Sequence, residues 1–346
     1  MLISVPLVAC FGAGPGGPIA PWRFGYLPAK PAAQDALAAI FFHIPKTGGT
    51  TLEAAFANYA TSNGLTYETC YNWMIAECND TFTPADVVFG HFYDRNKTHG
   101  GKWGGSSVMQ GLMRGSKRPF YRATMFRHPV ERQISHYFYI HAFDKESKVP
   151  SFHDVFPHRW PDSYQWEAAF GTRSQAQVSN SKCSVDGALA MLRRTFELVG
   201  TTELFDLSLM TWANKLHSQS PLFYVRGDQR QEGSRGSRRS IIHQTWLSQY
   251  SSSVASLKER LSSPDMCLWK AASKIVMQEA EIRNIASSQV DEFKAANTAH
   301  AEWVRKHVDR NVSGDHQWRV NSQYAPGSRW RENCNVCIPS DRYATV

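Results

Sequence analysis

The chain has 346 residues and a formal net charge of +8, with 42% hydrophobic and 20% charged residues. This composition excludes an intrinsically disordered chain, and the length suits one large domain or a domain with an appendage. A basic protein suits an anionic partner, and because the sequence shows no recognisable nucleic-acid-binding signature, we expect a polysaccharide or a nucleotide and no nucleic acid.

Residues 1–36 are predicted to lie outside the folded domain. This segment is apolar at first, becomes rich in glycine and proline, and contains no run of roughly 18 apolar residues that would cross a bilayer. Three interpretations stay open: a weak signal peptide, the remnant of a membrane anchor, or a tail. If the protein associates with a membrane, we expect this segment to be responsible.

The first predicted element is a strand that leads through an anion-binding loop into a helix. Ala38–Ile44 is an apolar run that stops at Pro45, which cannot donate to a sheet. Thr50 and Glu53 match the T-x-x-E capping box of a helix start. Glycines let a backbone approach an anion closely, the amides of a helix N-terminus favour negative charge, and a lysine adds a mobile positive charge. The predicted anion-binding residues are Lys46, Thr47, Gly48, Gly49, Thr50 and Thr51.

A second short strand is predicted at Asp86–Gly90, directly before His91. An imidazole titrates near neutral pH and can accept the proton of an attacking hydroxyl, so His91 is our candidate general base. A histidine that only makes structural hydrogen bonds at a strand end is the alternative. Three further histidines, His43, His128 and His136, lie near the motifs. His43 is expected to be structural, and His136 is the second candidate base.

A third strand and the helix after it are predicted over Tyr121–Tyr137. Pro129 suits the first helical turn, and Arg127 comes at the carboxyl end of the strand, the edge at which open α/β sheets bind ligands. Arginine can bind a phosphate through two hydrogen bonds, and Ser135 on the helix can add a neutral donor. This segment is therefore the second predicted anion site. An arginine that caps an ordinary amphipathic helix is the alternative.

Further strands are predicted at Phe196–Gly200 and Leu222–Val225, with a helix capped by Thr201 between them. The later strand leads into Arg226–Arg239, a polar basic stretch that we expect to be a loop. This loop binds an anionic polysaccharide or the phosphate edge of a nucleotide, or it is only solvated, as charge runs usually are. Its arginines are Arg226, Arg230, Arg235, Arg238 and Arg239.

The cysteines and sequons do not settle the cellular compartment. In an oxidising lumen, Cys70 with Cys78 and Cys334 with Cys337 are candidate local disulfides, although connectivity cannot be deduced from sequence. The terminal C-x-x-C can also be half of a zinc site, but the chain shows no suitable second half, so we expect no metal. N-x-[ST] sequons, in a number that chance would supply, occur at Asn79, Asn96 and Asn311.

The motifs resemble those of a known family. The order P-K-T-G-G-T-T, from Pro45 to Thr51, resembles the 5′-phosphosulfate loop of the Golgi sulfotransferases that sulfate polysaccharides such as heparan sulfate. The pattern R-x-P-x-x-R-x-x-S, from Arg127 to Ser135, resembles their 3′-phosphate site. The F-G-H-F that contains His91 and the later L-V-G-T-T-E-L-F-D resemble segments of the heparan sulfate and uronyl 2-O-sulfotransferases. The resemblance covers the chain from about residue 40 to about residue 216.

This resemblance implies an α/β fold of the P-loop-like kind, a parallel sheet flanked by helices on both faces, over residues 37–330. Residues 331–346 would be a polar tail. It implies an enzyme that moves a sulfuryl group from 3′-phosphoadenosine 5′-phosphosulfate, without a metal, to a hydroxyl of an anionic polysaccharide. It also implies the Golgi lumen or secretory pathway, although the N-terminal signal-anchor helix usual in the family is not evident in this sequence.

The resemblance also assigns roles to single residues. The backbone amides of Thr47–Thr51 would hold the 5′-phosphate, and Lys46 would neutralise the charge on the bridging oxygen as the S–O bond breaks. Arg127 and Ser135 would bind the 3′-phosphate, and His91 would accept the proton. In the family a basic loop closes over the nucleotide. The residues of this chain assigned to that loop are Arg235 and Arg238.

Two other functions stay open. One is a nucleotide kinase or triphosphatase with a degenerate loop, because the usual G-x-x-x-x-G-K-[ST] order occurs nowhere in the chain. Such a protein would bind ATP with Mg²⁺ and ignore the phosphosulfate. The other is a non-catalytic heparin-binding protein on the same scaffold, which would bind polyanions without turnover.

Overall fold

The computed structural model describes residues 37–63, 65–70, 86–90, 93–94, 102–103, 120–140, 149–157, 163–170, 184–218, 221–224 and 234–307. The strands are β1 (Ala38–Phe42), β2 (Tyr67–Cys70), β3 (Val87–Gly90), β4 (Tyr93–Asp94), β5 (Lys102–Trp103), β6 (Phe120–Phe126) and β7 (Leu198–Thr201). The helices are α1 (Gly49–Ser62), α4 (Pro129–Ile140), α5 (Phe152–Val155), α6 (Tyr164–Phe170), α8 (Val185–Thr195), α9 (Phe205–Lys215), α10 (Ser234–Arg260), α11 (Pro264–Ile282) and α12 (Ser287–His307).

Five of the strands form one parallel sheet in the order β2-β3-β1-β6-β7. β1 lies at the centre, where Ile40 pairs with Val88 of β3 on one side and with Arg122 of β6 on the other. Every residue of β1 is buried, as expected for a strand in a parallel sheet that is covered on both faces. The predicted α/β class with a parallel sheet is confirmed.

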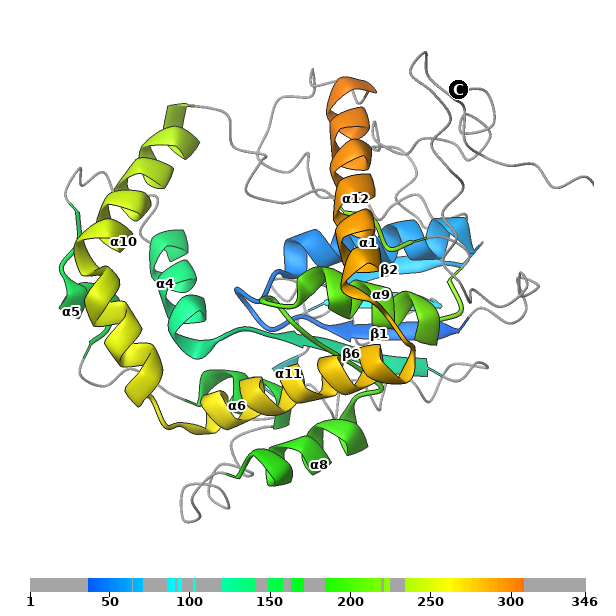
Figure 1. The fold of residues 1–346 in the computed structure, drawn as a ribbon, viewed down its shortest axis with the longest axis horizontal. Helices are drawn as coiled ribbons and strands as arrows, with labels where there is room; N and C mark the ends of the chain where they lie inside the picture. Colours follow the sequence, from blue (N-terminus) through cyan, green and yellow to red (C-terminus); the bar gives the residue numbers. More distant parts are fainter. Residues whose placement is uncertain are drawn as a thin grey trace, which may run out of the picture.

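Helices cover both faces of this sheet (Figure 1). The side chains of β1 alternate between two hydrophobic cores. Ala39 and Phe41 belong to the core formed with α1, α9 and α12. Ala38, Ile40 and Phe42 belong to the core formed with α6, α8 and α11. The predicted covering of both faces is therefore also confirmed.

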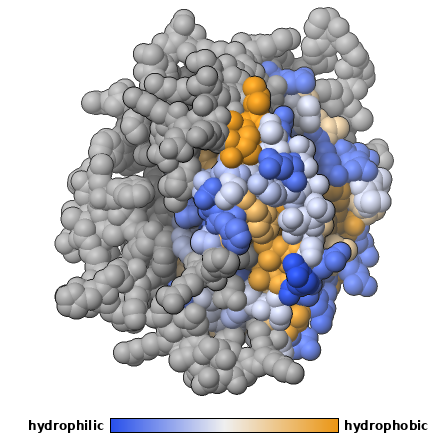
Figure 2. Space-filling view, turned by 90° about the vertical axis from the view of Figure 1, so that its left-hand side faces the viewer, coloured by the Kyte–Doolittle hydropathy of each residue, from blue (hydrophilic) through white to orange (hydrophobic). Residues whose placement is uncertain are grey.

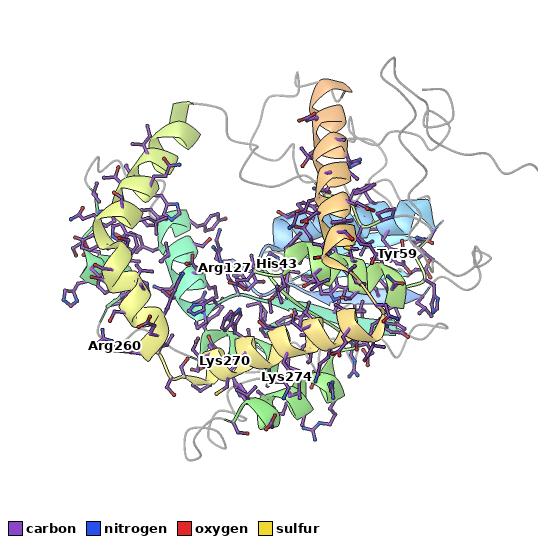
Figure 3. The ribbon with its side chains drawn as sticks, viewed as in Figure 1. His43, Tyr59, Arg127, Arg260, Lys270 and Lys274 are labelled. Carbon is purple, nitrogen blue, oxygen red and sulfur yellow. The ribbon has the colours of Figure 1, made fainter. Side chains whose placement is uncertain are left out.

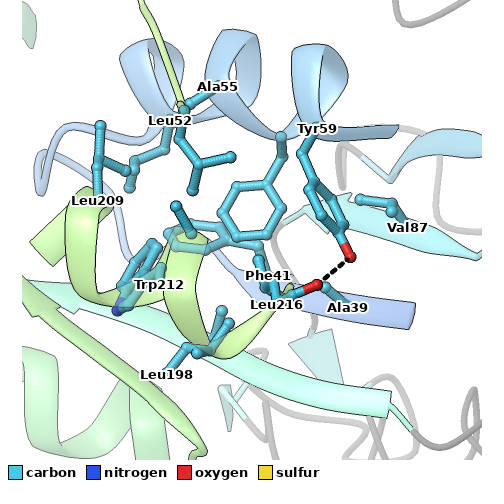
Figure 4. Packing of buried hydrophobic residues seen from close by; sticks show 14 of the residues in the cluster. Ala39, Phe41, Leu52, Ala55, Tyr59, Val87, Leu198, Leu209, Trp212 and Leu216 are labelled. Atoms are coloured by element: carbon cyan, nitrogen blue, oxygen red, sulfur yellow. Dashed lines mark hydrogen bonds between the residues drawn. The ribbon is translucent and has the colours of Figure 1, made fainter. Parts of the chain in front are cut away.

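The core on the α1 side is built around aromatic rings (Figure 4). The Phe41 ring centroid lies 5.4 Å from that of Phe56 and 6.1 Å from that of Trp212. Tyr59 of α1 lies in the same core, and its hydroxyl is 2.7 Å from the carbonyl oxygen of Leu37 and 3.2 Å from that of Leu216. Because the buried phenol finds these acceptors, it ties α1 to the start of β1 and to the end of α9.

A third hydrophobic cluster lies beside the sheet and is formed by α4, α5 and α10. Val130, Ile134 and Phe138 of α4 pack there, and the rings of Phe138 and Trp246 of α10 are T-shaped to each other, with their centroids 5.8 Å apart. On the side of the molecule formed by α5 and α10, hydrophobic residues reach the surface in patches separated by hydrophilic ones (Figure 2). α4 therefore connects the sheet to this third cluster, because it follows β6 in the chain and its apolar residues pack in the cluster.

The segment at 221–224 is not a strand, contrary to the prediction for 222–225. The Tyr224 amide donates to Asn297 Oδ1 of α12 at 2.7 Å, and Asn58 Nδ2 of α1 donates to the Phe223 carbonyl at 3.1 Å. Side chains of two helices thus satisfy backbone groups that a strand would satisfy through a sheet.

The basic stretch is helical in its last part, contrary to the predicted loop, because α10 begins at Ser234. A helix that is anchored by the packing of Trp246 can extend by one hydrogen bond per residue without further apolar contacts. The predicted helix cap at Thr201 is also wrong, since Thr201 ends β7 and α9 begins at Phe205. The predicted loop residues that lie on α10 are Arg235, Arg238 and Arg239.

Other expectations fall on parts of the chain that the structure does not describe. Residues 1–36 and 331–346 are among them, as are the three sequons and the side chains of the four cysteines proposed to form local disulfides. Of the helices that are described, none has both the length and the apolar character needed to cross a bilayer.

Candidate functional site

The carboxyl ends of β1 and β6 bring the two predicted anion-binding segments to one edge of the sheet. The two strands are parallel neighbours. After β1 the chain passes to the face covered by α1, and after β6 it passes through α4 to α6 on the opposite face. Neighbouring strands whose connections leave to opposite faces open a crevice at their carboxyl ends, where α/β proteins bind ligands.

The loop between β1 and α1 contains two residues with left-handed backbone. Lys46 has a φ of 69° and Gly48 a φ of 86°. Thr47 between them is buried, and its hydroxyl donates to the Ile44 carbonyl at 2.8 Å. Left-handed backbone is costly for a residue with a side chain, and such strain gathers at functional sites. Turns of this kind also form concave sets of amides that bind anions.

α1 begins two residues earlier than the predicted capping box requires. The Gly48 carbonyl accepts the Thr51 amide at 3.0 Å, so Gly48 is the capping residue and Gly49 the first helical one. Thr50 lies inside the first turn, and its predicted capping role with Glu53, which is 3% exposed, is wrong. The amides of a first helical turn have no acceptor within the helix, and the helix dipole there favours an anion.

His43 packs directly against Gly49. A Cβ atom added to Gly49 would lie 1.8 Å from His43 Nε2. The His43 side chain is 7% exposed, its ring centroid lies 5.5 Å from that of Phe89, and its backbone amide donates to the Gly90 carbonyl of β3 at 2.8 Å. Gly49 is thus required by packing as well as by any close approach of an anion, and His43 belongs to the core.

Arg127 connects the second motif to the first (Figure 3). Its Nη1 lies 3.5 Å from the carbonyl oxygen of Lys46, 81 residues earlier in the chain. Gln165 of α6 holds the backbone of Arg127, because its Oε1 accepts the Arg127 amide at 2.9 Å and its Nε2 donates to the Arg127 carbonyl at 2.8 Å. The guanidinium also lies 3.7 Å from the Glu131 carboxylate. Burial lowers the pKa of Arg127, but a guanidinium stays charged in proteins.

One side of α4 faces the loop. The Lys46 ammonium lies 3.9 Å from the centroid of the Tyr139 ring, a cation–π contact. Ser135, which is half-buried, precedes Tyr139 by four residues and Arg132 precedes it by seven, so helical spacing places all three on one stripe. Arg132 is 2% exposed, and its guanidinium lies 4.1 Å from the centroid of the Tyr164 ring. Nothing in the sequence pattern indicated that Arg132 would be buried.

The start of α4 is fixed by a contact between two of the motif segments, which the sequence pattern did not predict. The His128 amide donates to Glu203 Oε1 at 2.9 Å, and the Val130 amide donates to His128 Nδ1 at 3.2 Å. Trp269 of α11 donates to the other oxygen of Glu203 at 2.9 Å. Burial, with a smaller effect of Lys258, lowers the pKa of His128 to about 4, so its imidazole is neutral at neutral pH. Glu203 lies in the L-V-G-T-T-E-L-F-D segment, but no local sequence signal predicts its partners, because they lie 75 and 66 residues away.

The structure brings part of the predicted site together and leaves part of it undescribed. Lys46, the loop that follows it and Arg127 meet at the sheet edge, with Ser135 on the adjacent stripe of α4. His91 follows β3 directly but lies outside the described residues. Over the ranges that the structure covers, no group of three histidine, cysteine or carboxylate side chains could hold a metal ion. The predicted residues whose side chains are not described are Thr50, His91, Arg235 and Arg238.

No protein-family model matches this chain, and no curated protein matches it. Its function is therefore inferred from the geometry of this site and from the chemistry of its residues.

Proposed function

We propose that the protein is a sulfotransferase that moves a sulfuryl group from 3′-phosphoadenosine 5′-phosphosulfate to a hydroxyl of an anionic polysaccharide. The observation that carries the proposal is the 3.5 Å approach of Arg127 Nη1 to the Lys46 carbonyl. Each motif is an anion site by its own chemistry, and this contact joins the two at one sheet edge. A central strand that runs into a glycine-containing loop and a helix supports the P-loop-like fold that this function implies.

The proposed donor carries negative charge at two separate positions, and the site offers two separate anion-binding positions. Lys46 and the backbone amides of Thr47–Thr51 would hold the 5′-phosphosulfate at the N-terminus of α1. Arg127 and Ser135 would hold the 3′-phosphate beside the start of α4. The further nucleotide contacts that we propose come from α10, at Arg235 and Arg238.

In the proposed reaction the acceptor oxygen attacks the sulfur atom, the bond from sulfur to the bridging oxygen breaks, and adenosine 3′,5′-bisphosphate leaves. The acceptor proton passes to His91, the proposed general base. Lys46 neutralises the charge that develops on the bridging oxygen, so these residues need no metal ion for this step.

A comparison of nucleotides by thermal shift tests the donor site. A ligand that binds the native state raises its stability by RT ln(1 + [L]/Kd), which is about 2.7 kcal/mol at a hundred times Kd. We expect adenosine 3′,5′-bisphosphate to raise the melting temperature, and adenosine 5′-phosphate at equal concentration to raise it much less. A larger shift with ATP and Mg²⁺ than with the bisphosphate would contradict the proposal and favour a nucleotide kinase or triphosphatase.

A turnover assay tests the enzyme against the alternative of a non-catalytic heparin-binding protein. We expect labelled sulfate to pass from the donor to at least one member of a panel of uronic-acid polysaccharides. Retention on heparin without transfer to any of them would favour the binding protein. Replacing Arg235, Arg238 and Arg239 together by alanine should advance elution from heparin, because the affinity of a basic segment for a polyanion depends on charge. Unchanged elution would mean that these arginines are only solvated.

The proposal places the protein in the Golgi lumen or elsewhere in the secretory pathway, with membrane association through residues 1–36. Glycosidase-sensitive glycans at the sequons of the expressed full-length chain would support this location. A chain that stays unglycosylated and keeps its cysteines reduced in cells would contradict it.

A further inference from the structure

Arg132 is a buried cation without the hydrogen bonds that a buried cation normally has. It is 2% exposed and ranks among the largest fully buried side chains of the described chain. Its Nε and Nη1 groups meet no hydrogen-bond acceptor in the part of the chain that the structure describes. An unsatisfied buried donor costs about 1–3 kcal/mol, and more for a charged group, so a native structure that keeps one calls for an explanation.

The surroundings of Arg132 offset its charge without satisfying its donors. The guanidinium lies 4.1 Å from the centroid of the Tyr164 ring. The carboxylate whose charge acts on it is that of Asp265, whose two oxygens accept the amides of Gln165 at 3.0 Å and Trp166 at 2.8 Å. Burial lowers the pKa of Arg132, the Asp265 carboxylate opposes this change, and the positive charge of Arg127 adds to it. The fold thus holds the positive charges of Arg127 and Arg132 close enough to repel each other.

A second arginine of the same chain has the partner that a structural arginine needs. Arg122 of β6 donates from Nε to Glu197 Oε2 at 3.0 Å, and its Nη2 pairs with the other oxygen of the same carboxylate. This is the two-pronged pairing that arginine prefers. Arg132 is more deeply buried than Arg122 and yet has no such partner among the described residues, so holding the fold together does not explain it.

The position of Arg132 points to the anion site. Arg132 shares the stripe of α4 with Ser135 and with Tyr139, on which Lys46 rests. Tyr164, which stacks on Arg132, directly precedes Gln165, which holds both backbone groups of Arg127. The Arg132 side chain and the Arg127 backbone are therefore fixed by consecutive residues of α6. Arg132 is the buried member of this stripe and lies toward the N-terminus of α4.

We propose that Arg132 is a second cation of the 3′-phosphate subsite and determines the preference for nucleotides that carry a 3′-phosphate. The inference rests on the proposed function. A buried charge is screened little by salt or water, so its field acts on an anion held by Arg127 and Ser135. The Arg132 donors that meet no acceptor among the described residues gain a negative partner when the phosphate binds. The free-energy cost of burying these donors is therefore offset only when the nucleotide is bound.

The test is the ratio of two affinities, those for adenosine 3′,5′-bisphosphate and for adenosine 5′-phosphate, measured by calorimetry on the full chain. In Arg132→Met we expect bisphosphate affinity to fall by about 30-fold or more, the lower end of the cost of removing one partner of a buried charge pair. Affinity for adenosine 5′-phosphate should change little, so the ratio of bisphosphate affinity to monophosphate affinity should fall. The melting temperature without nucleotide should stay near that of the wild type, because Asp265 keeps its two amide donors.

Arg122→Met is the matched control. It removes an arginine whose partner is Glu197, so we expect a lower melting temperature and an unchanged affinity ratio. If Arg132→Met does not fold, Arg132→Lys replaces it, because a compact ammonium cannot place two donors in a fixed fork, and we expect its ratio to fall several-fold. An unchanged ratio in the folded Arg132 variant would overturn the inference and make Arg132 structural.

The same experiment separates this inference from the proposed function. If the wild-type protein prefers the bisphosphate and the Arg132 variant keeps the full preference, only the role of Arg132 is wrong. If the wild-type protein shows no preference for the 3′-phosphate, the sulfotransferase proposal and the inference are both wrong.

Discussion

Replacing Gly49 by alanine tests the packing of the phosphate loop. The added methyl group would lie 1.8, 2.0 and 2.3 Å from three atoms of the His43 ring, and real Cβ contacts essentially never come closer than 3.0 Å. The ring would have to move by about 1 Å or more, although it is 7% exposed and enclosed by core residues. Overpacking of this kind typically costs about 1–3 kcal/mol, and we expect a value toward the upper end.

Thermal unfolding followed by circular dichroism measures this effect. A loss of 1 kcal/mol lowers the melting temperature of a large domain by about 2–4 °C, so Gly49→Ala should lower it by roughly 4–10 °C. Gly187→Ala is the control, because Gly187 is exposed on α8 and its added Cβ would lie 2.9 Å from a single side-chain atom, the Ser184 hydroxyl oxygen that caps α8. Displacing this cap costs stability, and the higher helix propensity of alanine offsets that cost. We expect that variant to melt near the wild-type temperature.

A double-mutant cycle identifies the cause. His43→Ala alone should destabilise the protein by about 2–4 kcal/mol, because it leaves a cavity. In Gly49→Ala/His43→Ala the new methyl group enters space that the ring has left, so the double variant should be more stable than the sum of the two losses predicts. Strictly additive losses, or a Gly49→Ala variant that melts with the wild type, would refute the packing argument.

Three further predictions concern chemistry and pH. Lys46→Ala should reduce turnover by on the order of a hundredfold with a smaller loss of bisphosphate affinity, whereas Lys274→Ala, at a lysine of α11 that is 47% exposed, should keep normal rates; a normal rate in Lys46→Ala would exclude the proposed role. His91→Ala should bind nucleotide normally and nearly abolish sulfation, and if sulfation persisted at the normal rate, the base would have to be sought elsewhere, first at His136. Burial lowers the pKa of His300 from 6.5 to about 4, so the folded state holds this imidazole neutral, and its contribution to stability is complete above pH 6.5 and is lost as the pH falls toward 4. His300→Phe should remove up to roughly 3 kcal/mol of the decrease in unfolding free energy over that range, measured by urea denaturation, and an unchanged pH dependence would contradict this.

The elements that could be predicted from sequence are those whose signal is local. The apolar run before Pro45 predicted β1, because a strand buried on both faces reads as a continuous apolar run. The segment before Arg127, although it contains Arg122 and Thr124, was also correctly predicted to be a strand, β6. The rule that parallel strands bind ligands at their carboxyl ends predicted that Lys46 and Arg127 would share an edge, and the 3.5 Å contact between them agrees with it.

The parts that could not be predicted depend on distant partners. The 221–224 segment has strand-like composition, but its Tyr224 amide donates to the side chain of Asn297, which lies 73 residues later in the chain. Gln165, which belongs to no motif, holds the backbone of Arg127. Glu203 lies in the L-V-G-T-T-E-L-F-D segment, but that segment does not reveal its contact with the start of α4, 75 residues earlier. The burial of Arg132 depends on α6, whose contact with α4 no local pattern encodes.

The strand order has a consequence for how the site opens. β1 and β6 each have a neighbour on both sides, so their amides should exchange with solvent only in the most costly unfolding events, while the edge strands β2 and β7 open more easily. The stripe of α4, by contrast, belongs to a helix whose apolar face packs in a separate cluster. The site thus combines two parts with different stability. β1 and β6 move only with the whole sheet, whereas α4 can shift together with α5 and α10. We expect adenosine 3′,5′-bisphosphate to slow amide hydrogen exchange in α4 more than in β1 or β6.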